Sequence, residues 1–229
     1  TVWISPVLKN RLDRDDTYHG YGIQNYLEVD PRFGSSDDLR RLADEAHRRG
    51  MYIILDIIIN HTGDNWAYPG DHPYYYWPEA PGPFPFGYWR QADPAPGLQD
   101  DDAVWPVELQ SPEWYKRRGQ IRNWQDQQEA LHGDFSSLKE LDLRRSEVLE
   151  SLIRAYKYWI ALTDIDGFRL DTVKHMEDTA TAIFCNAIRE YARRIGKHNF
   201  FFFGEVVGDD AVLQRYIGRN CRFPESGER

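Results

Sequence analysis

The chain has 229 residues, of which 41% are hydrophobic and 28% are charged, a composition typical of a globular protein with one or two domains. Its net charge is −9 and no long run of lysine and arginine occurs, so neither nucleic acid nor an anionic membrane surface is an expected partner. The longest apolar stretch, residues 52–59, is interrupted by Asp56 and is too short to span a bilayer.

Two cysteines, Cys185 and Cys221, are too few for a disulfide scaffold and lack the spacing of metal ligands. Each is therefore predicted to be a buried thiol. The chain starts inside an apolar run without methionine and ends in polar sequence, so we expect it to be an internal piece of a longer protein.

Four apolar runs predict buried parallel strands: residues 2–7, 52–59, 165–171 and 200–206. Strands of this kind are joined by helices that cross over the sheet in a right-handed sense. The alternation of these runs with helical patterns therefore favours a parallel α/β fold.

Three amphipathic helices are predicted between the strands. The first is capped by Ser36 and ends at Gly50. Its predicted buried face consists of Leu39, Leu42, Ala43 and Ala46. Two further apolar stripes run through residues 148–160 and 183–195, and the second stops at Gly196.

The connection between the second and third strands is unusually long. Asp171 and Glu205 are 34 positions apart, a normal strand-to-strand repeat, whereas Asp56 and Asp171 are 115 apart. Residues 62–137 hold six of the eight tryptophans, which predicts a small irregular lobe rather than disorder.

The strongest chemical signal lies in residues 167–175. Arg169 and Asp171 are two positions apart at a strand end, so their side chains point to the same side. A neighbouring guanidinium favours the ionised carboxylate, and an ionised carboxylate suits a covalent nucleophile. Taken alone, the pair also fits a structural Arg–Asp pair on a buried strand.

Other polar positions mark the ends of the neighbouring strands. Asp56 lies inside an apolar strand and must be paired, and Arg169 is its expected partner. Asn60 and His61 follow that strand at its carboxyl end. Glu205 follows an apolar strand, where burial is expected to raise its pKa as a general acid requires, although a strand-terminal acid that caps the next helix is the alternative.

Together these motifs resemble the alpha-amylase family of glycoside hydrolases. The matching segments occur in the family's order and at compatible spacings. They are residues 2–6, 18–21, 56–61, 138–142, 167–175 and 203–206. Several coincident motifs are far more specific than any one of them, and they cover nearly the whole chain, which is thereby identified as a fragment of a catalytic domain.

The resemblance implies a partial (β/α)8 TIM barrel, from its second to its fifth strand, with the irregular lobe inserted after the third. Residues 1–61 would form the first part of the barrel, residues 62–137 the inserted lobe (similar to the family's domain B), and residues 138–229 the continued, truncated barrel. Most aromatic rings of the lobe are expected to be buried, and rings near the cleft, Trp66 or Tyr68 among them, are candidates to meet substrate, between which the sequence does not choose.

The resemblance also implies roles for individual residues. Asp171 would be the nucleophile and Glu205 the acid and then the base of a retaining mechanism, with their carboxyl groups about 5–5.5 Å apart. The implied substrate-binding residues are His19, Tyr21, His61, Arg169, Lys174 and His175.

Calcium is the one cofactor that the resemblance implies, and no organic cofactor is expected. Asn60 matches a calcium ligand of the family, as does the backbone oxygen of His175. Glu140 stands where the family usually has Asp, and Gly22 where it often has Trp. The family's last motif, Asn-His-Asp, is not found after Glu205.

The implied function is a retaining glycoside hydrolase or transglycosidase that acts on alpha-linked glucans or gluco-oligosaccharides. Activity is expected of the full-length protein, and the isolated 229 residues are expected to be inactive. An amylase-like carbohydrate-binding or scaffold protein that has lost catalysis is the alternative, disfavoured because both Asp171 and Glu205 are present. An unrelated barrel enzyme is disfavoured because no phosphate-binding glycine loop occurs.

Overall fold

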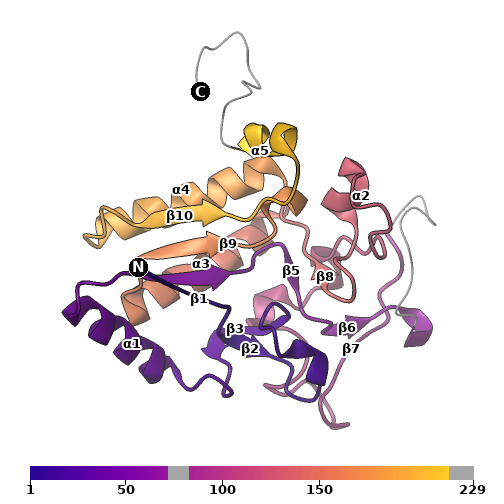
Figure 1. Ribbon diagram of the computed structural model, residues 1–229. Coiled ribbons are helices and arrows are strands. Elements are labelled where there is room, and N and C mark those ends of the chain that lie inside the picture. Colours follow the sequence, from indigo (N-terminus) through magenta and orange to yellow (C-terminus); the bar gives the residue numbers. More distant parts are fainter. Residues whose placement is uncertain (72–82, 217–229) are drawn as a thin grey trace.

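The computed structural model describes residues 1–71 and 83–216 (Figure 1). At its centre is a parallel four-stranded sheet in the order β1-β4-β9-β10. Its strands are β1 (Val2–Ile4), β4 (Ile53–Ile57), β9 (Gly167–Leu170) and β10 (Phe201–Gly204). The four predicted strands are therefore present, each shorter than its apolar run. Pro6 has no amide hydrogen to donate, which is consistent with the early end of β1.

A helix forms each crossover between neighbouring strands of this sheet. They are α1 (Ser36–Arg48), α3 (Ser146–Thr163) and α4 (Asp178–Arg194). Helix α3 contacts both α1 and α4, so the three pack side by side. The large side chains of Tyr156 and Trp159 on α3 are fully buried. A further short helix, α5 (Asp210–Tyr216), follows β10.

Three details of the predicted helices are wrong. The cap of α1 is Ser35, not Ser36: its side chain accepts from the amide of Asp38, and the Asp38 carboxylate accepts from the Ser35 amide. Leu42, assigned to the buried face of α1, is 44% exposed. On α4 the buried positions are Ala180, Phe184, Ile188 and Ala192, spaced by four, which leaves Ile183 and Ile195 exposed.

The central sheet is curled. Strands β1 and β10 are its two edges, yet the rings of Trp3 and Phe203 meet edge to face with centroids 5.7 Å apart. The guanidinium of Arg169, on β9, lies 5.5 Å from the centre of the Trp3 ring. These three side chains therefore lie on the concave face of the sheet.

An antiparallel pair that the sequence did not predict lies between β1 and α1. It consists of β2 (Leu8–Asn10) and β3 (Ile23–Val29), with the short helix η1 (Asp15–Thr17) between them. The segment that joins these strands carries His19 and Tyr21.

The chain between β4 and α3 is built of short elements. They are β5 (His61–Thr62), β6 (Trp66–Ala67), η2 (Pro69–Asp71), β7 (Tyr88–Trp89), η3 (Val107–Leu109), η4 (Pro112–Trp114), α2 (Gln127–His132) and β8 (Lys139–Glu140). Strand β5 pairs with β8, and β6 pairs with β7. The Trp66 ring packs on Tyr68, Phe86 and Tyr115. Trp66 and Tyr68 are fully buried, so neither ring is available to substrate.

In the described ranges, no helix has both the length and the apolar character needed to cross a membrane. Cys185, on α4, is partly rather than fully buried, and its burial raises the pKa of the thiol. The other cysteine, Cys221, lies outside the described residues.

Candidate active site

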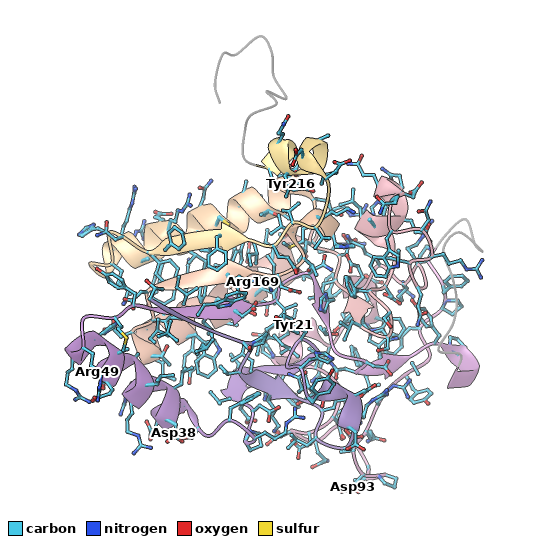
Figure 2. The ribbon with its side chains drawn as sticks, viewed as in Figure 1. Tyr21, Asp38, Arg49, Asp93, Arg169 and Tyr216 are labelled. Atoms are coloured by element: carbon cyan, nitrogen blue, oxygen red, sulfur yellow. The ribbon has the colours of Figure 1, made fainter. Side chains whose placement is uncertain are left out.

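One guanidinium joins three carboxyl groups at the carboxyl ends of three adjacent strands. Nη1 of Arg169 lies 2.9 Å from Oδ1 of Asp56 and 2.6 Å from Oδ1 of Asp171, and Nη2 lies 3.0 Å from Oε1 of Glu205. Figure 2 shows Arg169 near the centre of the molecule, close to Tyr21. The predicted pairing of Asp56 with Arg169 is confirmed, and Asp171 and Glu205 share the same cation.

The pKa of Asp171 differs from the prediction, which was a carboxylate kept ionised by Arg169. The side chain is 6% exposed, and this burial raises the pKa of Asp171 to about 7, although Arg169 opposes the shift. Glu205 and Asp56 add to the rise, and burial raises the pKa of Asp56 as well. A single cation shared among three acids does not hold Asp171 ionised in the way that an isolated Arg–Asp pair would.

Glu205 is less buried than its apolar strand predicted. Its side chain is 36% exposed, and its Oε2 accepts from the amide of Thr172 at 3.2 Å. The apolar surroundings expected there are absent, because the residue follows β10 and meets a guanidinium and a backbone amide. Helix α5 is capped instead by Asp209, which accepts from the amide of Val212 at 3.0 Å.

A cavity of about 550 Å³ opens over the two carboxyl groups. Asp171 and Glu205 line it together with His19, Tyr21 and His61, and Phe135 contributes a wall from the inserted segment. Its volume lies within the range of small-molecule sites. The two acids are therefore open to one shared space.

A tight turn places the rings of His19 and Tyr21 against each other. Gly20 has φ +85°, and a Cβ there would lie 2.5 Å from the Pro6 carbonyl oxygen, so the turn requires glycine. The Tyr21 amide donates to Nδ1 of His19 at 2.9 Å, and the two rings stack 5.8 Å apart. The Tyr21 hydroxyl donates to Oδ2 of Asp56 at 3.1 Å, and burial raises the pKa of Tyr21 to about 12.

His61 is a buried neutral imidazole on the cavity wall. Burial lowers the pKa of His61 to about 3, and the ring stacks on Phe135 with centroids 6.0 Å apart. Its Nε2 has no hydrogen-bond partner among the residues that the structure describes. An unpaired buried polar atom costs about 1–3 kcal/mol, so a ligand hydroxyl that reached Nε2 would be stabilised there.

The other predicted binding residues lie outside the lining of this cavity. Nζ of Lys174 donates to the Trp124 carbonyl oxygen at 3.2 Å, and Nδ1 of His175 lies 2.8 Å from the Ala130 carbonyl oxygen. Both residues thus contact the inserted segment. Arg169 contacts the three acids.

Sequence reasoning missed Phe135, which stacks on His61 and also contacts His175 edge to face. The only feature of the sequence that could have pointed to Phe135 is its position shortly before the segment 138–142. It missed Thr172 as well, whose amide holds Glu205. Asn60 is fully buried, and its Nδ2 donates to Oε2 of Glu140 at 2.7 Å.

Comparison with known proteins gives the family. Residues 1–220 match the family model of the alpha-amylase catalytic domain, so the chain belongs to the alpha-amylase family. It is 32% identical over 250 residues to an alpha-amylase of Streptomyces lividans, an alignment that covers 95% of this chain and 26% of the relative. It is 27% identical to a cyclomaltodextrin glucanotransferase of Klebsiella oxytoca, with 96% and 31% covered.

A solved structure supports the same assignment. The alpha-amylase from Geobacillus thermoleovorans, complexed with acarbose, matches with a TM-score of 0.66 at 32% identity. The match covers 95% of this chain and 38% of that chain. The chain thus spans between a quarter and two fifths of the length of these three relatives.

Proposed function

We propose that the intact protein is a retaining glycoside hydrolase or transglycosidase that acts on α-linked glucans or gluco-oligosaccharides. The observation that carries the proposal is the pair Asp171 and Glu205, which share one guanidinium and line one cavity. The relatives include an alpha-amylase, a cyclomaltodextrin glucanotransferase and an oligo-1,6-glucosidase, and these names support an α-glucan substrate.

The finer architecture belongs to the same proposal. Strands β1, β4, β9 and β10 would be the second to fifth strands of a (β/α)8 barrel, with residues 62–137 as a lobe inserted after the third strand. The parallel order of the strands, the helix in each crossover and the curl that brings Trp3 to Phe203 all support this arrangement.

In the proposed reaction, a carboxylate oxygen of Asp171 attacks the anomeric carbon of the sugar. As the glycosidic bond breaks, Glu205 gives its proton to the leaving oxygen, and a glycosyl ester of Asp171 forms. The Glu205 carboxylate then takes a proton from water or from a sugar hydroxyl, whose oxygen displaces Asp171 at the same carbon. Two displacements return the anomeric centre to its original configuration.

Arg169 and His61 would support these steps without exchanging protons. Arg169 holds Asp171 and Glu205 on one planar group, which fixes their relative positions. His61 is neutral near pH 7 because its pKa is lowered to about 3, so its free Nε2 is suited to a hydrogen bond with a sugar hydroxyl.

The stereochemistry of the first product tests this proposal. The intact protein is incubated with maltooligosaccharides, and the anomeric protons are followed by NMR before mutarotation, with Glu205→Gln as the inactive control. We expect the α-anomer to appear first. The β-anomer would contradict the retaining mechanism, and the absence of any cleavage or transfer would favour a carbohydrate-binding protein.

A further inference from the structure

A lysine ammonium is buried where the inserted segment meets the central sheet. The Lys116 side chain is 2% exposed, and its Nζ donates to the Leu131 carbonyl oxygen at 2.5 Å. The same Nζ lies 3.4 Å from Oε1 of Glu140 and 3.1 Å from Oε1 of Glu177. These oxygens come from α2, from β8 and from the residue before α4, so one cation connects three elements.

This ammonium lies among the side chains that the resemblance assigns to calcium. Glu140 stands at a calcium-ligand position of the family, and its Oε2 accepts from Nδ2 of Asn60. Asn60 is the other side chain assigned to the metal, and it turns its NH₂ group, not its oxygen, toward Glu140. The Asn60 Oδ1 is buried and has no partner among the described residues.

The donor set does not suit Ca²⁺ as it stands. Calcium takes about six to eight oxygen ligands at about 2.3–2.6 Å, and it depends on carboxylates for much of its binding energy. Here the Glu140 carboxylate is held by Lys116 and Asn60, and Lys116 also lies 3.1 Å from Oε1 of Glu177. Across the described ranges, no group of three or more His, Cys, Asp or Glu side chains is arranged to hold a metal ion. A Ca²⁺ on the same oxygens would also be repelled by the nearby ammonium.

We propose that the Lys116 ammonium takes the place of a structural calcium ion, and that the fold of this protein is independent of calcium. The ammonium lies 3.4 Å from Oε1 of Glu140 and donates to the Leu131 carbonyl oxygen, so it already occupies the space between these oxygens. Because this cation is covalently part of the chain, its occupancy does not vary with calcium concentration.

The position of the cluster links it to the candidate active site. Asn60 precedes His61, and the Asn60 carbonyl oxygen accepts from the amide of Leu141 at 2.9 Å. The Lys116 amide donates to the Glu140 carbonyl oxygen at 3.1 Å. The Lys116 segment is thus bonded to β8, which pairs with β5, the strand that carries His61 to the cavity.

Thermal unfolding of the intact protein tests this inference. Wild type is measured by circular dichroism in excess EDTA and in millimolar CaCl₂, and its calcium content after dialysis is determined by mass spectrometry. We expect the two midpoints to agree and less than stoichiometric calcium to be found. A midpoint that falls in EDTA and is restored by CaCl₂ would overturn the proposal.

A matched pair of lysine variants completes the test. Lys116→Met keeps the length of the side chain and removes its charge, and it is expected to lower the unfolding midpoint by about 5–15 °C because buried carboxylates lose their counter-charge. Lys157→Met, at a partly exposed lysine of α3, is expected to have little effect. Equal midpoints for the two variants would show that the buried ammonium is not structural. If Lys116→Met does not fold, the wild-type EDTA measurement still decides the question.

Discussion

Two buried charge clusters in this protein are built in opposite ways. At the carboxyl ends of the sheet, one guanidinium serves three acids, and Glu205 remains 36% exposed on a cavity. Where the inserted segment joins the sheet, Lys116 and Glu140 are 2% and 1% exposed, and the ammonium also contacts Glu177 and the Leu131 carbonyl oxygen.

The difference separates a site for chemistry from a site for structure. Burial, with smaller contributions from Glu205 and Asp56, raises the pKa of Asp171 to about 7, and perturbed groups that face a cavity are typical of functional sites. The Lys116 cluster pairs buried opposite charges, and it is costly to break because one partner is then left buried and uncompensated.

Removal of either proposed catalytic carboxyl group is expected to have the largest effect. Glu205→Gln should lower kcat by about 10²–10⁴-fold, the usual contribution of a general acid, and Asp171→Asn by at least about as much. Asp44→Asn, at an exposed acid of α1, is the control and should leave turnover unchanged. Steady-state kinetics with a maltooligosaccharide measures the three variants, and near-normal turnover in either site variant would remove its assigned role.

Removal of the shared cation tests the charge balance at the site. Arg169→Met should lower the free energy of unfolding by about 3–5 kcal/mol near neutral pH, because buried carboxylates lose their partner. The loss should be smaller at about pH 5, where protonated acids need no counter-charge. Urea unfolding of wild type and Arg169→Met at the two pH values measures this loss of unfolding free energy. A loss that does not depend on pH would show that Arg169 acts by packing alone.

The raised pKa of Asp171 predicts the direction in which the stability of the protein changes with pH. Between its ordinary value of 3.8 and about 7, the folded state binds more protons at Asp171 than the unfolded state does. The contribution of Asp171 to stability therefore falls as pH rises through this window. Asp171→Asn removes the titration, so its free energy of unfolding relative to wild type should increase from about pH 4 to about pH 7. An opposite slope in urea unfolding would mean that Arg169 outweighs burial.

The smallest expected effect lies far from both clusters. Ser35→Ala should destabilise the protein by about 1 kcal/mol, because the amide of Asp38 loses its acceptor at the start of α1. Ser36→Ala is the matched control and should be close to neutral. If Ser36→Ala is the more destabilising of the two in urea unfolding, the cap assignment is wrong.

Local patterns allowed much of this fold and of the candidate site to be predicted. Period-two alternation placed Arg169 beside Asp171, and burial of a lone acid in an apolar strand pointed to the Asp56–Arg169 pair, 113 positions apart. The cap of α1 was predicted one residue too late, at Ser36, although Ser35 and Asp38 have the three-residue spacing of a capping box.

Properties that depend on long-range packing could not be predicted from the sequence. The pKa of Asp171 depends first on its burial and then on the acids that share Arg169, which come from three strands. Lys116 lies in a loop with no local signal and meets Glu140 24 positions later. Lys174 lies within the recognisable motif of residues 167–175, but its contact with the Trp124 carbonyl oxygen depends on the path of the inserted segment.

Covalent trapping tests the central claim most directly. The intact Glu205→Gln variant is incubated with a fluorinated α-glucosyl fluoride, whose leaving group needs no acid and whose ester persists without the base. Peptide mass spectrometry then locates the label, with Asp171→Asn as the control that should remain unlabelled. We predict a glycosyl ester on Asp171. A label on another residue, or equal labelling of the Asp171→Asn control, would contradict the assignment of Asp171 as the nucleophile.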